Sequence, residues 1–221
     1  MEKLILSDQI AYNSPTGNRE VAVLAPEDWE QRWREGTTSW DLGGVTPSLV
    51  EYCREKNPRG LDVLVPGCGR GYDAHFLARQ GARVVALDYA PAALEAARTT
   101  HPESRVDWQI ADVTVLDFKH RFDLVWEYTC FCALDPPRRQ AYLAGVARAL
   151  RPGGHYQGLV FHSFPKSGGP PWPVDVENFR DLLATNLAIV AFEENTQRSL
   201  KARLNTEIWF SARKLPVVPP S

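Results

Sequence analysis

Residues 61–73, with the sequence LDVLVPGCGRGYD, constrain the fold of this chain more than any other stretch. The apolar run at 61–65 predicts a strand that is buried on both faces of a parallel sheet. Gly67, Gly69 and Gly71 follow at two-residue spacing, which lets the backbone turn tightly and lets a ligand come close to it. A helix is expected directly after the last glycine, and its free N–H groups would point at the same place. The stretch therefore predicts a nucleotide-like ligand at this turn.

The residues that follow complete a βαβ unit. AHFLARQG at 74–81 predicts a helix, and RVVALD at 83–88 predicts a second buried strand. Asp88 ends that strand, 21 positions after Gly67, where dinucleotide-binding folds place an acid on the ribose hydroxyls. The alternative is that Asp88 only caps the next helix, because Asp is a common capping residue.

The rest of the chain alternates between strand and helix patterns and ends differently. Strands are expected at 105–113 and 121–131, a helix at 136–150, a turn and long strand at 151–164, and a helix at 176–186. LAIVAFEE and LNTEIWFSAR then follow with no long helix between them, so we expect them to pair as an antiparallel hairpin. The loop at 167–173, SGGPPWP, is expected to be stiff and to cross the sheet edge.

Three tryptophans precede the glycine turn. PEDWEQRWREG at 26–36 predicts a helix with Trp29 and Trp33 on one face, and Trp40 follows after a turn. One interpretation is that these indoles anchor the N-terminal helices to the sheet. The other is a lid whose aromatic faces enclose a cationic ligand. Both interpretations stay open on the residues alone.

We expect a single domain with four parts. These are an irregular arm at 1–25, a helical lid at 26–57, a core at 58–213 and a flexible tail at 214–221. The second helix of the lid is expected to be capped by Thr46, with Pro47 in its first turn.

Composition excludes several classes of function. The chain is 44% hydrophobic with a net charge of −2 and mixed charges, so we expect no nucleic acid or membrane partner. No apolar run suits a signal peptide or a membrane span, which predicts a cytoplasmic protein. Four unevenly spaced cysteines predict free thiols, and the five histidines are scattered, so we expect no metal site. A monomer that acts on a small molecule is favoured.

The glycine turn, the acids that end the second and third strands, and the terminal hairpin resemble the class I S-adenosylmethionine-dependent methyltransferase fold. The resemblance implies an α/β, Rossmann-like, seven-stranded mixed sheet with helices on both faces, a C-terminal antiparallel hairpin and an N-terminal helical lid. A nicotinamide dehydrogenase is the rival, but its fingerprint places the third glycine one residue later, where this chain has Tyr72.

Four segments, in the same order, are similar to the thiopurine methyltransferase superfamily, and in particular to its halide and thiol methyltransferase branch. They are WEQRWREGTTSWDLGGVTPSLV, LVPGCGRGYD, FDLVWEYTCFCAL and GGPPWPV. The resemblance favours the lid and implies S-adenosylmethionine as the cofactor. The residues that it implies for cofactor contact are Trp29, Trp33, Trp40, Gly67, Gly69, Asp88, Asp112, Val113 and Tyr128. The chemistry agrees, because Asp88 offers acceptors for the ribose hydroxyls and Asp112 offers one for the adenine amino group.

A methyl acceptor in this branch is a small soft nucleophile, namely a thiol, bisulfide, thiocyanate or halide. An anionic nucleophile has no proton to lose, so we expect alignment and exclusion of water to matter more than a strong base. The candidates for catalytic roles are Tyr128 and His162, the latter as an aid to thiol deprotonation. The candidates for the substrate pocket are Cys130, Phe161 and Trp172, with Cys132 as a weaker one.

Two departures from the family pattern leave the acceptor open. Phe161 stands where plant members tend to carry a tyrosine, and the segment before the final strand reads NTQRSLKARLNTE. Heterocyclic thiols, or selenium and tellurium species, are therefore alternative acceptors. A domain that binds S-adenosylmethionine without turnover is a further alternative.

Overall fold

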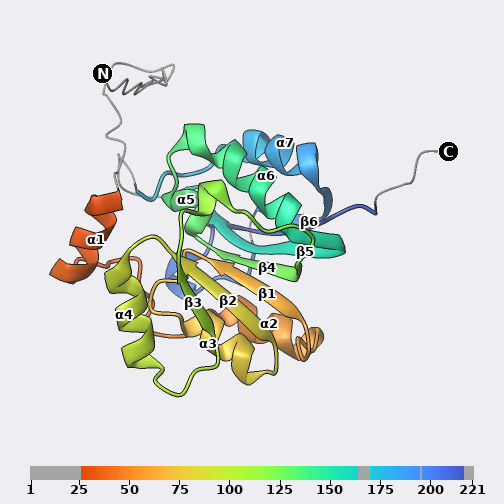
Figure 1. The fold of residues 1–221 in the computed structure, drawn as a ribbon. Coiled ribbons are helices and arrows are strands. Elements are labelled where there is room, and N and C mark those ends of the chain that lie inside the picture. Colours follow the sequence, from red (N-terminus) through yellow and green to blue (C-terminus); the bar gives the residue numbers. More distant parts are fainter. Residues whose placement is uncertain (1–25, 164–169, 195, 217–221) are drawn as a thin grey trace, which may run out of the picture.

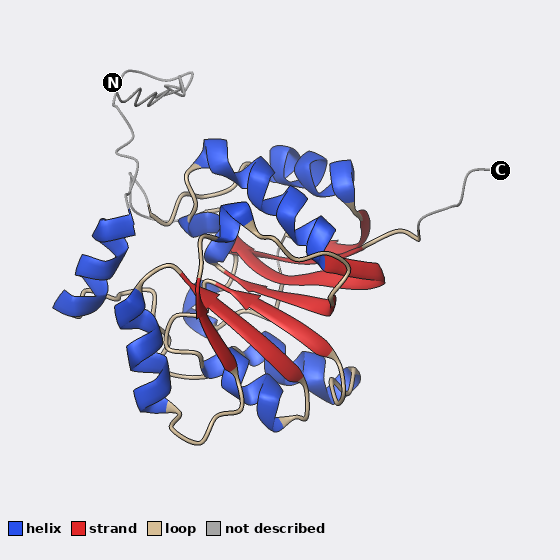
Figure 2. Cartoon of the chain, viewed as in Figure 1, coloured by secondary structure: helices blue, strands red, loops and turns tan. Residues whose placement is uncertain are grey.

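The computed structural model describes residues 26–163, 170–194 and 196–216. One seven-stranded sheet runs through the molecule and carries helices on both faces, as Figures 1 and 2 show. The expected arm at 1–25, most of the expected tail and residues 167–169 of the expected loop lie outside the described residues. Within the described ranges, every helix is too short or too polar to cross a membrane.

The strand order is β3-β2-β1-β4-β5-β7-β6. Strands β1 to β5 are parallel, and β7 runs antiparallel to both β5 and β6. The strands are β1 (Asp62–Pro66), β2 (Arg83–Asp88), β3 (Asp107–Ile110), β4 (Phe122–Tyr128), β5 (Leu150–Phe161), β6 (Ala188–Glu193) and β7 (Glu207–Arg213). The predicted α/β class, the mixed sheet and the C-terminal antiparallel pair are confirmed.

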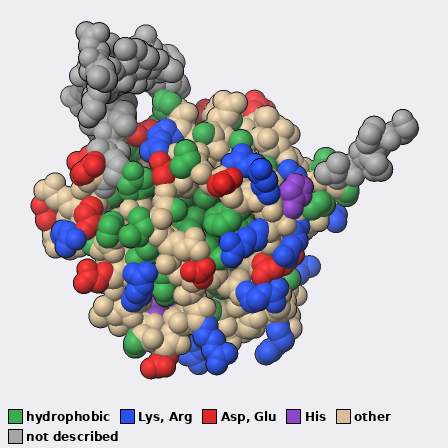
Figure 3. All heavy atoms as spheres, in the orientation of Figure 1, with side chains coloured by type: hydrophobic (Ala, Val, Ile, Leu, Met, Phe, Trp, Pro, Cys, Tyr) green, Lys and Arg blue, Asp and Glu red, His purple; other side chains and the backbone are tan. Residues whose placement is uncertain are grey.

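Seven α-helices and three short 3₁₀ turns connect the strands in the part of the chain that is described. The α-helices are α1 (Pro26–Glu35), α2 (Pro47–Glu55), α3 (Tyr72–Arg79), α4 (Pro91–Thr100), α5 (Cys130–Ala133), α6 (Arg139–Ala149) and α7 (Val176–Asn186). The 3₁₀ turns are η1 (Val113–Val115), η2 (Pro136–Arg138) and η3 (Lys201–Arg203). On the face drawn in Figure 3, hydrophobic side chains gather near the middle, with charged side chains of both signs around them.

Two of the local predictions that were wrong concern the ends of elements near the cavity. The strand expected at 121–131 ends at Tyr128, because Thr129 adopts a left-handed conformation and Cys130 then begins α5. Thr46 is the N-cap residue of α2, but its hydroxyl makes no capping bond. That hydroxyl instead donates to Asp73 of α3, at 2.8 Å, and so joins two elements rather than closing one helix.

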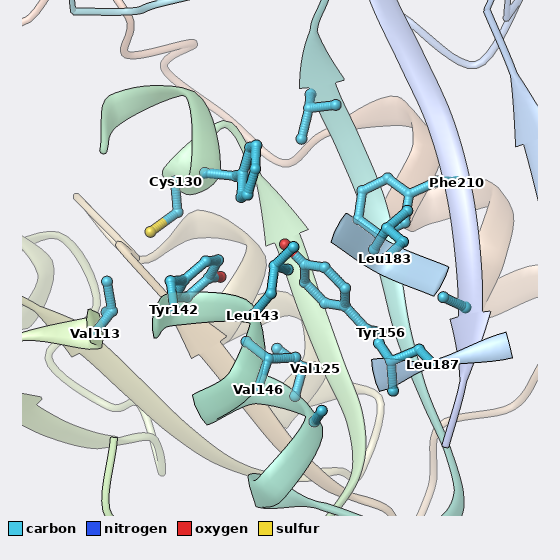
Figure 4. Close-up of a cluster of buried hydrophobic side chains, with 14 of the residues drawn as sticks. Val113, Val125, Cys130, Tyr142, Leu143, Val146, Tyr156, Leu183, Leu187 and Phe210 are labelled. Carbon is cyan, nitrogen blue, oxygen red and sulfur yellow. The ribbon is translucent and has the colours of Figure 1, made fainter. Parts of the chain in front are cut away.

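The apolar core has two parts, one on each face of the sheet. Helices α5, α6 and α7 pack on one face, and α2 and α3 pack on the other. Tyr142 of α6 and Tyr156 of β5 lie close together in the first part, with ring centroids 6.4 Å apart (Figure 4). This packing fixes the carboxyl ends of the parallel strands, where ligands bind in open α/β folds.

A buried carboxyl group lies within that packing. Glu127 of β4 accepts hydrogen bonds from the hydroxyls of Tyr142 and Tyr156, at 2.7 and 2.8 Å. Its other oxygen accepts from the backbone N–H of Phe131, at 3.0 Å, in the first turn of α5. Burial raises the pKa of Glu127. The contact orients α5, and therefore Cys130, relative to the end of β4.

Candidate active site

A cavity of about 210 Å³ lies at the carboxyl ends of the parallel strands. Its walls come from the segment around α1, the glycine turn after β1, and the ends of β2, β4 and β5. Most of the residues chosen from the sequence line it together. These are Trp29, Trp33, Trp40, Gly67, Gly69, Asp88, Asp112, Val113, Tyr128, Cys130 and Phe161.

The glycine turn brings the backbone of β1 to the cavity. Gly67 and Gly69 have φ values of +59° and +52°, in the left-handed region that favours glycine. A Cβ atom on Gly67 would lie 2.8 Å from the sulfur of Cys130, so a larger residue would displace α5. A Cβ atom on Gly69 would lie 3.4 Å from the ring of Trp33. The turn therefore lies between α5 on one side and the tryptophans on the other.

Asp88 is buried at the end of β2 and faces this turn. One carboxylate oxygen accepts from the N–H of Gly69 at 2.9 Å, and the other accepts from the N–H of Ala90 at 3.0 Å. Burial raises the pKa of Asp88, which these backbone hydrogen bonds oppose. Ala90, not Asp88, is the N-cap residue of α4. Because a carboxylate has about four acceptor positions, Asp88 keeps capacity for hydroxyl donors in the cavity.

The three indoles form an aromatic wall. Trp40 meets Trp29 and Trp33 edge to face, with ring centroids 5.4 and 6.1 Å apart. All three are only partly buried and lie outside both parts of the apolar core. The structure thus places them on the cavity and not in the core, as the lid interpretation requires.

The side chains of Glu30, Asp41 and Thr46 help to dock the segment at residues 26–46, here called the tryptophan segment, onto the core. Glu30 accepts from the backbone N–H of Ala92 in the first turn of α4, at 2.9 Å. Asp41 pairs with Arg70 of the glycine turn, at 2.5 Å, and the Arg70 guanidinium lies over the Trp33 ring. The third contact is the bond between Thr46 and Asp73.

Asp73 is the acid at the base of the cavity. Besides the Thr46 hydroxyl, it accepts from the Thr46 backbone N–H and from the Trp126 indole N–H, both at 2.8 Å. Burial raises its pKa, which these three donors oppose. Asp73 therefore fixes the C-terminal end of the tryptophan segment to the sheet.

Asp112 lies beyond the end of β3 with its carboxylate already engaged. It accepts from the backbone N–H and the hydroxyl of Thr114, at 2.9 and 2.7 Å, and it pairs with Arg138 of η2. Burial opposes ionisation of Asp112, but the hydrogen bonds from Thr114 and the charge of Arg138 outweigh it and lower its pKa. Asp112 is therefore an anion held beside Val113, which is buried on the cavity wall.

Sequence reasoning missed several residues around the cavity, among them Tyr89, Arg138 and Arg203. Tyr89 lines the cavity and is 36% exposed. Its position directly after Asp88, at the end of a strand, could have indicated this. Arg138 also lines it, through the pair with Asp112. Arg203 contacts the wall from behind, and no short motif could have shown this because its partners are distant in sequence.

Tyr128 faces the cavity at the end of β4. Its hydroxyl accepts from Arg203 at 2.6 Å and donates to Glu207 at 3.3 Å. Burial raises the pKa of Tyr128, so the phenol keeps its proton. Burial also raises the pKa of Cys130, which lines the cavity beside it as a neutral thiol. Phe161 completes this end of the wall without a polar group.

The structure does not bring three of the candidates to the cavity wall. His162 and Trp172 are not among its lining residues, although Pro170 and Pro171 are. The N–H of Trp172 bonds to the carbonyl of Cys132 at 2.8 Å, so Trp172 holds the loop against α5. The sulfur of Cys132 accepts from the N–H of Phe161, at 3.0 Å, behind the wall.

The sequence of this chain matches known proteins over most of its length. The family model described as Thiopurine S-methyltransferase matches residues 24–210. Thiocyanate methyltransferase 1 of Brassica oleracea is 35% identical over 187 residues, which cover 80% of this chain and 82% of the relative. Probable thiol methyltransferase 2 of Arabidopsis thaliana is 34% identical over 159 residues, which cover 70% of each chain.

A solved structure matches the fold across nearly the whole chain. It is the 1,6-didemethyltoxoflavin-N1-methyltransferase of Burkholderia thailandensis, solved with 1,6-didemethyltoxoflavin and S-adenosylhomocysteine. The TM-score is 0.70 at 24% identity, and the match covers 96% of this chain and 98% of the other. At that identity the likeness establishes a common fold.

Proposed function

Because this chain belongs to the thiopurine S-methyltransferase family, we propose that it transfers a methyl group to a small soft nucleophile: a thiol, bisulfide, thiocyanate or halide. The family is S-adenosylmethionine-dependent, and this is the cofactor of the chain. Support for the acceptor class comes from the relatives named for thiocyanate and thiol methylation. Further support comes from the side chains at the acceptor end of the cavity.

The cavity has the groups that the cofactor needs. The backbone at Gly67 and Gly69 would take its amino-acid end, Asp88 would accept from the ribose hydroxyls, and Asp112 would accept from the adenine amino group. The tryptophan wall suits a cation, because aromatic faces attract positive charge. When bound, S-adenosylmethionine supplies an electrophilic methyl group on a sulfonium sulfur.

The observation that carries the proposal is the chemistry of the acceptor end, defined by Tyr128, Cys130, Phe161, Pro170 and Pro171. Burial keeps the phenol and the thiol protonated, and the remaining side chains are apolar. Among these five residues there is no group ready to take a proton. An acceptor that arrives as an anion needs none.

The residues of this end would act by position and by exclusion of water. Phe161 and the two prolines offer an apolar wall, which strips hydration from a soft anion and so raises its reactivity. Fixing the nucleophile against the methyl group in line removes most of the entropy cost of their encounter. Tyr128 can donate a hydrogen bond that orients the anion without removing a proton.

The test compares acceptors with purified protein and methyl-labelled cofactor. Thiocyanate, iodide and a small thiol should accept label, and thiocyanate turnover should stay level between about pH 6 and 8 because the anion does not titrate there. The thiol rate should instead follow ionisation of the thiol. Labelling of a thiopurine, selenite or tellurite alone would favour the alternative acceptors. Binding of S-adenosylhomocysteine with no turnover of any acceptor would favour a binding domain.

A further inference from the structure

Arg203 lies behind the acceptor end of the cavity. It ends the 3₁₀ turn η3, just before β7, and its side chain is 16% exposed. Arg203 is not one of the residues that line the cavity, but its two aromatic neighbours, Tyr128 and Phe161, both line it. The guanidinium lies over the rings of Tyr128 and Phe161, at 5.6 and 5.1 Å from their centroids.

The two terminal nitrogens of Arg203 reach different parts of the chain. Nη1 donates to the Tyr128 hydroxyl oxygen at 2.6 Å. Nη2 donates to the backbone carbonyl of Trp40 at 3.1 Å. One planar cation therefore joins the acceptor wall to the tryptophan segment, which a guanidinium can do with little loss of entropy.

The hydrogen bonds of Tyr128 show what this cation does. The phenol oxygen accepts from Arg203, so its own proton has to go to a different acceptor. Glu207 is that acceptor, at 3.3 Å, which is longer than the 2.5–3.0 Å typical of O–H···O bonds. The hydrogen bond that Tyr128 donates to Glu207 is thus weak. The bond from Arg203 to the phenol oxygen makes the hydroxyl a stronger hydrogen-bond donor.

Arg203 pairs with one carboxylate, that of Glu207. Glu207 is fully buried, and the distance from Arg203 Nη1 to Glu207 Oε1 is 3.5 Å. Arg70 and Arg138, which do line the cavity, each form a short ion pair with an aspartate. The ion pair of Arg203 is therefore longer than those of Arg70 and Arg138, and its Nη1 atom is shared between Glu207 and the Tyr128 hydroxyl.

We propose that Arg203 is a positioning residue that favours anionic acceptors by holding Tyr128 as a hydrogen-bond donor toward the cavity. The inference rests on the proposed function and deepens it. A bound thiocyanate or halide would replace Glu207 as the acceptor of the Tyr128 proton. No bond to Arg203 changes when this happens.

The test is titration calorimetry of sodium thiocyanate into the protein saturated with S-adenosylhomocysteine, at constant ionic strength. Arg203→Gln should weaken thiocyanate binding by about tenfold or more, because the Tyr128 hydroxyl loses the charged donor that orients its proton toward the cavity. Arg203→Lys should restore part of the affinity. Arg198→Gln is the matched control, since Arg198 also lies over an aromatic ring, that of Trp209, and pairs with acids away from Tyr128.

A double variant separates positioning from general damage to the fold. Arg203→Gln added to Tyr128→Phe should cost little more than the worse single substitution, because Arg203 acts through the hydroxyl that Tyr128→Phe removes. Additive losses would overturn the inference. So would a wild-type complex that binds no thiocyanate, or an Arg203→Gln variant that loses S-adenosylhomocysteine affinity but binds thiocyanate normally. If thiocyanate binds as expected while no acceptor turns over, the proposed function fails and the inference stands.

Discussion

Replacing Asp88 with alanine tests the carboxylate that accepts the backbone N–H of Gly69 in the glycine turn. The substitution removes the expected acceptor of the ribose hydroxyls. It also leaves the N–H groups of Gly69 and Ala90 without their partners, which the sequence alone did not show. Asp88→Ala should therefore lower both the affinity for the cofactor and the stability of the protein without it.

The size of each effect follows from the burial of the donors. A buried unpaired N–H costs about 1–3 kcal/mol, and the contact at Ala90 is buried whereas that at Gly69 is only partly so. Asp88→Ala should thus destabilise the fold by about 2–4 kcal/mol, out of a typical total of about 5–15 kcal/mol. Loss of the ribose contacts should weaken binding by a further ~1.5–3 kcal/mol, or roughly 10- to 100-fold.

Urea unfolding without ligand and calorimetry with S-adenosylhomocysteine measure the two effects separately. Asp88→Asn is the matched control, because its one oxygen can keep one backbone bond while its NH₂ group cannot accept the other. It should recover about half of the lost stability. An unchanged unfolding midpoint for Asp88→Ala would refute the structural part of the reasoning. Unchanged affinity in a folded variant would refute the cofactor role.

Two further predictions concern the tryptophan segment and a histidine pair. Trp40→Ala removes two edge-to-face contacts, each worth about 0.5–1.5 kcal/mol, so S-adenosylhomocysteine affinity and methyl transfer should both fall; normal values for both would contradict the lid. His75 and His101 stack at 4.3 Å, and burial lowers both pKa values below the ordinary 6.5. Stability should therefore be full above pH 6.5 and fall below it, because the unfolded chain then binds more protons. His101→Gln should reduce the difference in urea midpoint between about pH 7.5 and 5.5; an equal difference would show that the pair does not cause it.

The wall of the cavity that we propose for the cofactor could be predicted because its signals are local. The turn at Gly67 and Gly69 follows its own strand directly, and Asp88 ends the next strand of the same βαβ unit. Parallel pairing then brings these ends to one edge of the sheet without further information. The three tryptophans were harder, because their spacing suited a core anchor and a lid equally well. In the structure all three line the cavity, which no spacing in the sequence could show.

The acceptor side could not be predicted in the same way. Cys130 and Cys132 were expected at a strand end, but the left-handed Thr129 puts them on α5, where alternate residues no longer face the same side. As a result Cys130 lines the cavity and Cys132 does not. His162 follows β5 directly, yet its position relative to the wall depends on loop packing that no periodicity encodes.

Arg203 shows most plainly what a linear pattern lacks. Its partners Tyr128 and Trp40 lie 75 and 163 residues away in the sequence, so only the folded chain brings the three together. Trp40 belongs to both ends of the cavity, since its indole meets the other tryptophans while its carbonyl accepts from Arg203. Docking of the tryptophan segment and placement of the Tyr128 hydroxyl are therefore not independent events. Because linkage between two sites is reciprocal, any factor by which bound cofactor raises acceptor affinity through this segment is also the factor by which bound acceptor raises cofactor affinity.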